Sequence, residues 1–446
     1  MRQHLTDRTS AVAPPRSSNV TPGLVSVVGL GYVGLPLAFR LEERGYRVVG
    51  IDTDSEKVRA LRSKVAPQLA SEEQAQLARS AMRLFQDPEH AYLRRAAIII
   101  VCVPTPVDDA HMPDLGPLTR AIESIGTYLS PGQLVIVEST VNPGVCDEVL
   151  LPILESRSGL TVGTDFFFAH CPERINPGDE KWTVATIPRV VGAGDAESLA
   201  RARTFYESVL DAQVFPMASL KEAEAVKIVE NSFRDINIAF VNELAMSFHR
   251  LGIDVMRVIE GASTKPFSFI PHTPGCGVGG HCIPVDPYYL ISYAEKNGFT
   301  HRFLSIAREV NNGMPKFTVD VLEETLVARG IDPRTATVAL LGLTYKRDVP
   351  DLRESPALVI ERDLRARGVT VVTYDPLVPE HASASSLEEA LAGADCALIA
   401  ADHTAFRALT PEDFARHGVS VVIDGKNCLP KDAFLAAGIT YRGIGT

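Results

Sequence analysis

Apolar runs alternate with amphipathic stretches along much of the chain, as in proteins built from alternating strands and helices. The first strand pattern is Leu24–Val28, an amphipathic stretch follows over residues 35–44, and a second strand pattern is Arg47–Ile51. Further strand patterns lie at residues 96–103, Leu134–Val137, 166–169 and 190–191. Strands that alternate with helices in this way predict a parallel, doubly wound sheet.

The pattern changes near Leu220, because no glycine or proline interrupts a helical pattern from there to Leu251. Apolar residues recur within this stretch at intervals of three and four, at Val229, Phe233, Ile236, Phe240 and Leu244. This spacing places them on one face of a long helix. Such a stripe packs either inside the molecule or against a second copy of the chain.

A loop dense in glycine and proline follows at residues 265–287, helical patterns resume to about residue 329, and a second alternating unit completes the chain. Its strand patterns lie at residues 337–343, 369–374, 396–400 and 419–423. We therefore predict an α/β protein with two Rossmann-like domains joined by a central helical domain. The expected divisions are a flexible tail at 1–22, a first domain at 23–217, a helical domain at 218–329 and a last domain at 330–446.

Composition and charge narrow the class of protein. The 446 residues exceed one ordinary domain, and 46% hydrophobic with 22% charged residues indicate a folded, soluble chain. A net charge of −11 without a basic stripe argues against nucleic-acid binding. No apolar run is long enough for a membrane span, and the first 22 residues lack the apolar core of a signal peptide. Seven scattered cysteines fit reduced thiols in the cytoplasm better than a disulfide framework.

A glycine turn between the first strand and the first helix predicts a dinucleotide site. Gly29 permits a tight turn, Gly31 lets the backbone approach a pyrophosphate, and Gly34 lets helix and strand pack closely. Asp52 ends the second strand, where a carboxylate bonds a ribose 2′-OH and repels a 2′-phosphate, so NAD is favoured over NADP. Within the turn, Tyr32 and Val33 are further expected cofactor contacts. An ordinary glycine turn with a surface acid is the alternative.

Two later strands end in residues that should line the same cofactor cleft. Pro104 and Thr105 follow one strand, and Thr140 follows another. Ligands of open α/β sheets bind at the carboxyl ends of the strands, which is where these residues fall.

The loop at residues 275–287, here called the cysteine loop, carries the most distinctive chemistry. Gly279 and Gly280 give a backbone that can approach a ligand, Cys282 follows directly, and Asp286 comes four residues later. A thiol in such a loop can act as a nucleophile if its surroundings favour the thiolate. Two other interpretations remain: a small buried cysteine, or a metal site that includes Cys276, His281, Cys282 and His272. The zinc spacing is poor, so no metal is expected.

Polar residues on the preceding helix are candidate partners of that cysteine. Lys227, Asn231 and Arg234 step by four and three and share one helix face. They are either a solvated polar face or donors to an oxyanion, and spacing does not decide between the two.

Four motifs together resemble the UDP-glucose/GDP-mannose dehydrogenase family from about Leu24 onward. They are residues 171–174 (CPER), 230–235 (ENSFRD), 279–282 (GGHC) and 351–356 (DLRESP). Within the family they are most similar to the branch that acts on UDP-N-acetylhexosamines in polysaccharide biosynthesis. The resemblance implies that the first domain binds NAD, that the last domain binds the UDP-sugar, and that the chain forms a homodimer or larger homo-oligomer.

The resemblance also implies roles for individual residues. Cys282 matches the nucleophile, Lys227 and Asn231 match stabilisers of oxyanions, and Asp286 and Thr140 match residues that hold or activate water. Glu173 matches a general base. The implied substrate contacts are Glu173, Arg174, Lys227, Asn231, Arg234, Lys265, Phe267, Gly279, Lys346 and Arg353.

The implied reaction is a four-electron oxidation of the sugar C6 hydroxyl to a carboxylate with two NAD. Cys282 would add to the intermediate aldehyde as a thiohemiacetal, a second oxidation would give a thioester, and water would release the acid. The expected substrate is UDP-N-acetyl-D-mannosamine, with UDP-N-acetylglucosamine or UDP-glucose as alternatives. Pro284 departs from the mannosamine pattern and residues 265–267 resemble glucosamine- or galactosamine-type relatives, so the epimer stays open.

Two other functions compete with this interpretation. A two-electron dehydrogenase of the 6-phosphogluconate or 3-hydroxyacid type would need neither the cysteine loop nor the last domain, and would release one NADH per substrate instead of two. A non-catalytic nucleotide-binding protein would keep the fold without turnover. The joint presence of Cys282, Lys227, Asn231, Asp286 and Glu173 favours catalysis.

Overall fold

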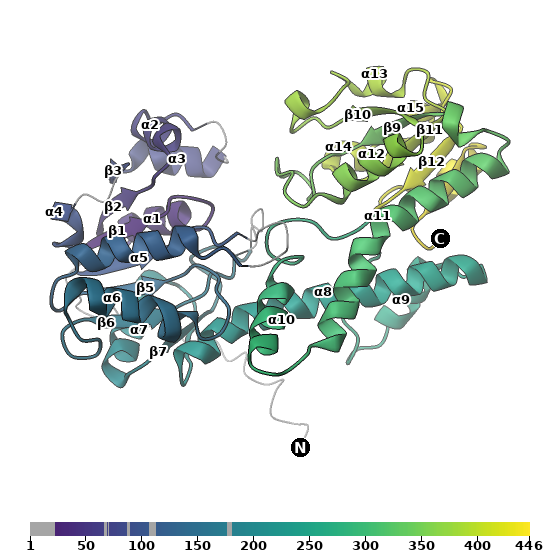
Figure 1. Ribbon diagram of the computed structural model, residues 1–446. Coiled ribbons are helices and arrows are strands. Elements are labelled where there is room, and N and C mark those ends of the chain that lie inside the picture. Colours follow the sequence, from purple (N-terminus) through teal and green to yellow (C-terminus); the bar gives the residue numbers. More distant parts are fainter. Residues whose placement is uncertain (1–22, 67–68, 70, 87–89, 107–112, 176–180) are drawn as a thin grey trace. The chain divides into compact units, whose positions relative to one another are not determined.

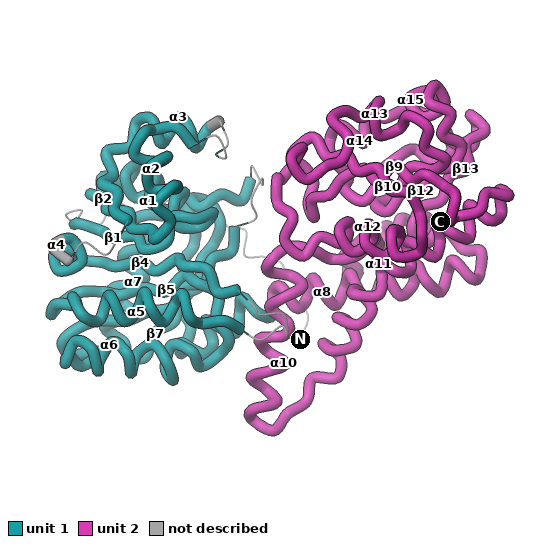
Figure 2. The backbone as a smooth tube through the Cα atoms, turned by 45° about the horizontal axis from the view of Figure 1, so that its top comes forward, with its two compact units in different colours: residues 1–229 teal, residues 230–446 magenta. Residues whose placement is uncertain are grey.

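The computed structural model describes residues 23–446 apart from 67–68, 70, 87–89, 107–112 and 176–180 (Figure 1). The tail expected at residues 1–22 lies outside the described residues. The chain divides into two compact units, residues 1–229 and residues 230–446 (Figure 2).

The first unit is built on an eight-stranded sheet whose order is β3-β2-β1-β4-β5-β6-β7-β8. Its strands are β1 (Leu24–Val28), β2 (Arg47–Ile51), β3 (Arg83–Phe85), β4 (Ile98–Val101), β5 (Leu134–Val137), β6 (Phe167–His170), β7 (Arg189–Ala193) and β8 (Val214–Pro216). The predicted parallel sheet is confirmed with one correction: β6 and β7 pair antiparallel. A parallel pair needs a long crossover, commonly helical, and the described residues between β6 and β7 contain no helix.

Helices cover both faces of this sheet, as expected for a doubly wound fold. They are α1 (Gly34–Glu43), α2 (Ser55–Arg62), α3 (Ser71–Arg79), α4 (His90–Leu93), α5 (Gly116–Tyr128), α6 (Leu151–Ser158) and α7 (Ala196–Val209), with a π-helical turn at Cys146–Leu150. Residues of α1 and α7 share one apolar core, and residues of α5 and α6 share another on the opposite face (Figure 1). The two cores fix the sheet that presents the glycine turn.

The long helix α8 (Leu220–Leu251) has the bounds that the sequence predicts, and it continues across the boundary between the two units. Its polarity is reversed: Asn231 and Asp235 are buried, whereas Val229, Phe233 and Phe240 are 56%, 49% and 53% exposed. Much of the apolar stripe is therefore not packed inside this chain, although Ile236 and Leu244 are half-buried and Leu244 packs against a core of the second unit.

The second unit combines helices with a five-stranded parallel sheet of order β10-β9-β11-β12-β13. The strands are β9 (Thr337–Leu341), β10 (Thr370–Tyr374), β11 (Cys396–Ile399), β12 (Val421–Asp424) and β13 (Thr440–Gly443). The helices are α9 (Val255–Ser263), α10 (Asp286–Lys296), α11 (Arg302–Ala328), α12 (Pro356–Ala366), α13 (Leu387–Leu391), α14 (Thr404–Arg407), α15 (Pro411–Ala415) and α16 (Lys431–Ala436). Residues of α11 and α12 build one core of this sheet, and residues of α13 to α16 build the other. In the part of the chain that is described, no helix has the length and apolar character needed to cross a bilayer.

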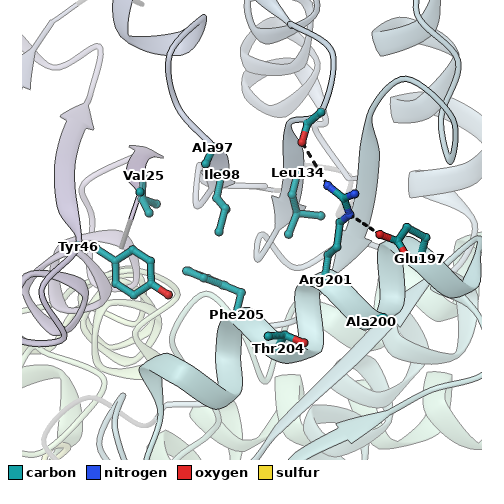
Figure 3. A pocket seen from close by; sticks show the side chains of 12 residues that line it. Val25, Tyr46, Ala97, Ile98, Leu134, Glu197, Ala200, Arg201, Thr204 and Phe205 are labelled. Atoms are coloured by element: carbon teal, nitrogen blue, oxygen red, sulfur yellow. Dashed lines mark hydrogen bonds and ion pairs between the residues drawn. The ribbon is translucent and has the colours of Figure 1, made fainter. Parts of the chain in front are cut away.

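A cavity of about 440 Å³ lies at the amino ends of β1, β4 and β5 (Figure 3). Tyr46, Ile98 and Phe205 are among its apolar lining, and Arg201 at its edge pairs with Glu197 at 2.7 Å. It opens at the edge of the sheet opposite to the glycine turn, so it is separate from the site described next.

Candidate functional site

The glycine turn after β1 has the shape that a pyrophosphate requires. Gly29 has a φ of +93°, and a Cβ there would lie 2.6 Å from the Cys102 carbonyl oxygen. A Cβ on Gly34 would lie 1.9 Å from the Gly29 carbonyl oxygen, whereas one on Gly31 would meet nothing within 4 Å. Two glycines are thus required for packing, and the third leaves open space, which fits a bound dinucleotide.

The amino end of α1 is free to receive an anion. Val33 caps the helix without a side-chain hydrogen bond, and Tyr32 beside it is 57% exposed. The first amide groups of a helix carry partial positive charge, so this end attracts phosphate. The turn and this helix end therefore present backbone amides and open space where the sequence predicts the pyrophosphate.

Asp52 is fixed at the end of β2 by three donors. Its Oδ2 accepts the Leu30 N–H at 2.8 Å and lies 2.9 Å from Lys57 Nζ, while its Oδ1 accepts the Asp54 N–H at 3.0 Å. The carboxylate is only 8% exposed, so its orientation is set before any ligand arrives. A rigid carboxylate here suits a ribose hydroxyl and opposes a 2′-phosphate.

Residues at the ends of β4 and β5 lie together. The Thr105 hydroxyl donates to the Thr140 carbonyl at 2.7 Å, and Pro104 beside it is exposed. The structure thus brings the two strand-end segments into contact at the carboxyl edge of the sheet, as the sequence predicts.

Glu173 belongs to a buried ionic cluster that the sequence did not reveal. Arg189 on β7 is fully buried, and its Nη2 lies 2.6 Å from Glu173 Oε2 while its Nη1 lies 3.2 Å from Glu138 Oε2. The hydroxyl of Tyr206 donates to the other oxygen of Glu138. Glu173 Oε1 also accepts the backbone N–H of Arg174 at 2.5 Å. One arginine therefore holds two carboxylates.

Burial governs the protonation of the groups around this cluster. It raises the pKa of the Glu138 carboxyl to about 7 against the opposing pull of Arg189. Burial likewise lowers the pKa of His170 to about 3, and it raises the pKa values of the Cys102 and Cys171 thiols above their usual range. His170 is therefore neutral, and both thiols stay protonated and unreactive.

The remaining candidates of the first unit lie at its surface. Arg174 is half-buried, and its Nη1 donates to the Pro188 carbonyl at 2.8 Å. Lys227 is half-buried on α8.

In the second unit, Asn231 and Asp286 meet. The Asn231 amide donates to Asp286 Oδ2 at 2.5 Å, and the two residues are 7% and 3% exposed. Arg234 is exposed on α8. The solvated polar face considered from the sequence is therefore wrong for Asn231, which is buried and hydrogen-bonded, and fits Arg234.

Cys282 lies one helical turn before α10. The N–H groups of Asp286 and Val285 donate to its carbonyl oxygen at 2.8 and 3.1 Å, so the thiol-bearing residue is tied to Asp286 through the backbone. Five of the seven cysteines are buried, and only Cys282 and Cys428 are half-buried. Cys276 is a core residue whose Sγ lies 3.5 Å from the Ala400 carbonyl oxygen. No group of three metal-binding side chains occurs within the residues that the structure describes.

A buried polar network between α8 and α11 binds the start of the cysteine loop. The Gly275 N–H donates to Asn242 Oδ1 at 3.0 Å, and the Asn242 amide donates to Asn311 on α11 at 2.8 Å. Asn311 and Arg308 both donate to Asp235 Oδ1, at 2.8 and 2.6 Å. This network explains why α8 turns polar residues inward.

The predicted nucleotide contacts lie on two segments of the second unit. Lys265 and Phe267 are exposed, with the ammonium 5.0 Å from the ring centre. Lys346 is half-buried, and Arg353 forms a two-pronged ion pair with Asp351. Gly279 lies in the cysteine loop against the segment that carries Lys346.

The structure adds Glu138, Arg189 and Tyr206 to the residues that the sequence singled out. One signal was available: Arg189 opens an apolar strand and Glu138 directly follows another. A charged residue next to a fully buried strand needs a partner, although the sequence does not say which.

Comparisons with known proteins cover nearly the whole chain. The UDP-glucose/GDP-mannose dehydrogenase family matches with its NAD binding domain at residues 23–210, its central domain at 221–313 and its UDP binding domain at 339–431. The chain is 38% identical to the UDP-N-acetyl-D-mannosamine dehydrogenase of Pyrococcus horikoshii, and the alignment covers 94% of this chain and 99% of that protein. It is 41% identical to the UDP-N-acetyl-D-glucosamine 6-dehydrogenase of Pseudomonas aeruginosa, and that alignment covers 79% of this chain and 83% of that protein. A solved structure of the Pyrococcus horikoshii enzyme superposes with a TM-score of 0.88 at 37% identity, covering 95% of this chain and 99% of that one.

Proposed function

The chain belongs to the UDP-glucose/GDP-mannose dehydrogenase family and is an NAD-dependent UDP-sugar dehydrogenase, and on this premise we propose that it oxidises UDP-N-acetyl-D-mannosamine to the uronic acid. The choice of sugar is supported by the 38% identity to an enzyme of that name across nearly the full length of both chains. UDP-N-acetyl-D-glucosamine is the second candidate, because residues 265–267 resemble glucosamine- or galactosamine-type relatives and the UDP-N-acetyl-D-glucosamine 6-dehydrogenase of Pseudomonas aeruginosa is 41% identical.

The contact between Asn231 and Asp286, one turn after Cys282, carries the proposal for the chemistry. An amide and a carboxylate that meet one turn after a half-buried thiol would supply it with an oxyanion donor and a water-binding group. NAD bound at the Gly29 turn supplies the hydride acceptance that each of two successive oxidations needs.

The first oxidation converts the C6 alcohol to an aldehyde, and Glu173 takes the hydroxyl proton. The Cys282 thiolate then forms a C–S bond to the aldehyde carbon, and Lys227 and Asn231 stabilise the oxyanion. Loss of a second hydride gives a thioester. Water held by Asp286 and Thr140 breaks the C–S bond, which releases the carboxylate and restores the thiol.

The sugar nucleotide is held by the second unit in this proposal. Lys346 and Arg353 bind the nucleotide, with Lys265, Phe267 and Gly279 as further contacts. Arg234, and Arg174 of the first unit, are further substrate contacts that the family resemblance implies. We place the protein in the cytoplasm, since all seven cysteines are free, and in polysaccharide biosynthesis, which consumes such uronic acids.

We also propose that the chain forms a homodimer. The exposed residues Val229, Phe233 and Phe240 form an apolar stripe along α8, and such a stripe favours burial against a second copy of the same helix.

The test measures NADH formed per mole of UDP-N-acetyl-D-mannosamine, UDP-N-acetyl-D-glucosamine, UDP-N-acetyl-D-galactosamine and UDP-glucose, side by side. We expect two NADH per sugar and the highest kcat/KM for the first substrate. Cys282→Ser should nearly abolish turnover while NAD binding is kept, and Cys428→Ser is the matched control. One NADH per sugar, or two from the Cys282→Ser enzyme, would refute the thioester route.

A further inference from the structure

The two glycines before Cys282 pack tightly against Tyr345, Gly280 against its ring and Gly279 against its Cβ. Gly280 has a φ of +90°, and its N–H donates to the Arg353 carbonyl at 3.0 Å. A Cβ on Gly280 would lie 2.6 Å from Cε2 of Tyr345, and one on Gly279 would lie 2.6 Å from Cβ of Tyr345 and 2.7 Å from the Glu354 carbonyl oxygen. The bare backbone of the loop therefore lies directly on this side chain and its neighbours.

The segment that carries the ring is itself fixed. The N–H groups of Leu343 and Thr344 donate to Asp375 Oδ2 at 2.7 and 3.0 Å, and the Tyr345 N–H donates to the Asp351 carbonyl at 3.1 Å. Ser355 closes the segment, because its hydroxyl donates to the Leu343 carbonyl at 2.6 Å. The ring thus offers a firm support for the loop.

We infer that Tyr345 is a positioning residue: its ring supports Gly280 and so sets the orientation of the Cys282 thiol two residues later. The inference rests on the proposed function for the role of Cys282. Lys346, a proposed nucleotide contact, is the next residue after Tyr345. The thiol and the nucleotide contact are therefore held by one continuous packing arrangement within the second unit.

The rate of Cys282 alkylation by iodoacetamide tests this directly, in a Cys428→Ser background where the other five cysteines are buried. Tyr345→Phe keeps the ring and should react within about twofold of the parent rate. Tyr345→Ala removes the support and should shift the rate at least about fivefold, with a matching fall in kcat and little change in the KM for NAD. A parent-like alkylation rate in folded Tyr345→Ala would overturn the inference.

Glycine variants give a second test, which compares the alkylation rates of single and double variants. Gly280→Ala should disturb the thiol because its new methyl group meets the ring and because a φ of +90° is strained for alanine. The double variant Gly280→Ala/Tyr345→Ala no longer has the clash with the ring, so its shift in alkylation rate should be smaller than the two single shifts combined. Gly279→Ala is the matched control: its methyl group meets Cβ of Tyr345, which alanine keeps, and the Glu354 carbonyl, so its effect should simply add to that of Tyr345→Ala. Strictly additive effects of Gly280→Ala and Tyr345→Ala would contradict the inference.

The outcomes separate the two proposals. If no UDP-sugar is oxidised but alkylation follows the predicted pattern, the proposed function fails and the positioning role stands. If two NADH form per sugar and alkylation ignores Tyr345, only the positioning role fails.

Discussion

Arg189 and Glu173 form an ion pair of 2.6 Å inside the first unit, with the arginine fully buried and the glutamate 5% exposed. The same guanidinium reaches Glu138 at 3.2 Å, so one positive charge serves two carboxylates. A buried pair of this kind contributes little net stability over an apolar core, yet losing one partner is costly because the other charge stays buried.

Replacing Arg189 by Met should therefore destabilise the protein by about 3–5 kcal/mol, since two buried carboxylates lose their counter-charge. The free energy of unfolding, measured by urea titration, checks this value. Arg201→Met is the control, because its pair with Glu197 is largely exposed and should cost about 1 kcal/mol or less. Equal losses in the two variants would show that the buried pair has no special role.

The raised pKa of Glu138, about 7 instead of 4.5, predicts a specific pH dependence of stability. Between these values the folded state binds a proton that the unfolded state releases, so this group's contribution falls as the pH rises. Glu138→Gln removes this titrating carboxyl group and with it the pH-dependent contribution. The stability of the variant relative to the parent should therefore rise from pH 4.5 to 7, by about 1.4 kcal/mol per pH unit at most.

Denaturant titrations of both proteins across that range supply the measurement. The free energy of unfolding of the variant is compared with that of the parent at each pH. This removes the contribution of His170, whose pKa is lowered by burial and which makes the stability of both proteins rise with pH. A constant difference between Glu138→Gln and the parent would mean that Glu138 does not titrate in this window.

Asp52 should control the choice of cofactor. Its carboxylate is fixed by Leu30 and Lys57 at the end of β2. Asp52→Asn removes the negative charge and leaves Lys57 to face a 2′-phosphate, so the kcat/KM preference for NAD over NADP should fall about tenfold, equivalent to about 1.4 kcal/mol. Initial rates with each cofactor test this, and an unchanged preference would assign the selection to other residues.

The apolar stripe of α8 predicts a subunit interface. Phe240→Glu and Phe233→Glu should convert a dimer to a monomer, because each places a charge within a buried apolar surface. Light scattering coupled to size exclusion gives the mass. Leu435→Glu on α16 is the control, as that leucine is similarly exposed but lies outside the stripe. A parent-size particle in both phenylalanine variants would exclude this face as the interface.

Much of the fold could be predicted because its central strands are buried on both faces. Leu134–Val137 is a continuous apolar run, Leu24–Val28 is apolar apart from Ser26, and the structure gives both those bounds. The strands β3, β8 and β13 were not predicted. β3 and β8 have three residues each, and β13 includes the exposed Arg442, so none offers a clear apolar period.

The candidate site was predictable where its residues are close in sequence, as in the glycine turn and the cysteine loop. Asn231 and Asp286 are 55 positions apart, and the resemblance to the family selected both before their contact was known. The pairing of Arg189 with Glu138 could not be predicted, because it depends on the order of strands in the sheet. The role of Tyr345 could not be predicted for a similar reason, since it comes from packing against a distant loop.

The continuity of α8 has a consequence for changes in chain length. Its first turns contribute buried residues such as Leu220 and Glu224 to one unit, and its later turns contribute Asp235 and Asn242 to the other. Each residue of an α-helix adds about 100° of rotation, so a single insertion near Val229 would turn Asn231 away from the face that it shares with Lys227. This helix should accept substitutions at exposed positions but reject insertions and deletions, and gene recombination within it should succeed only when the number of residues is conserved.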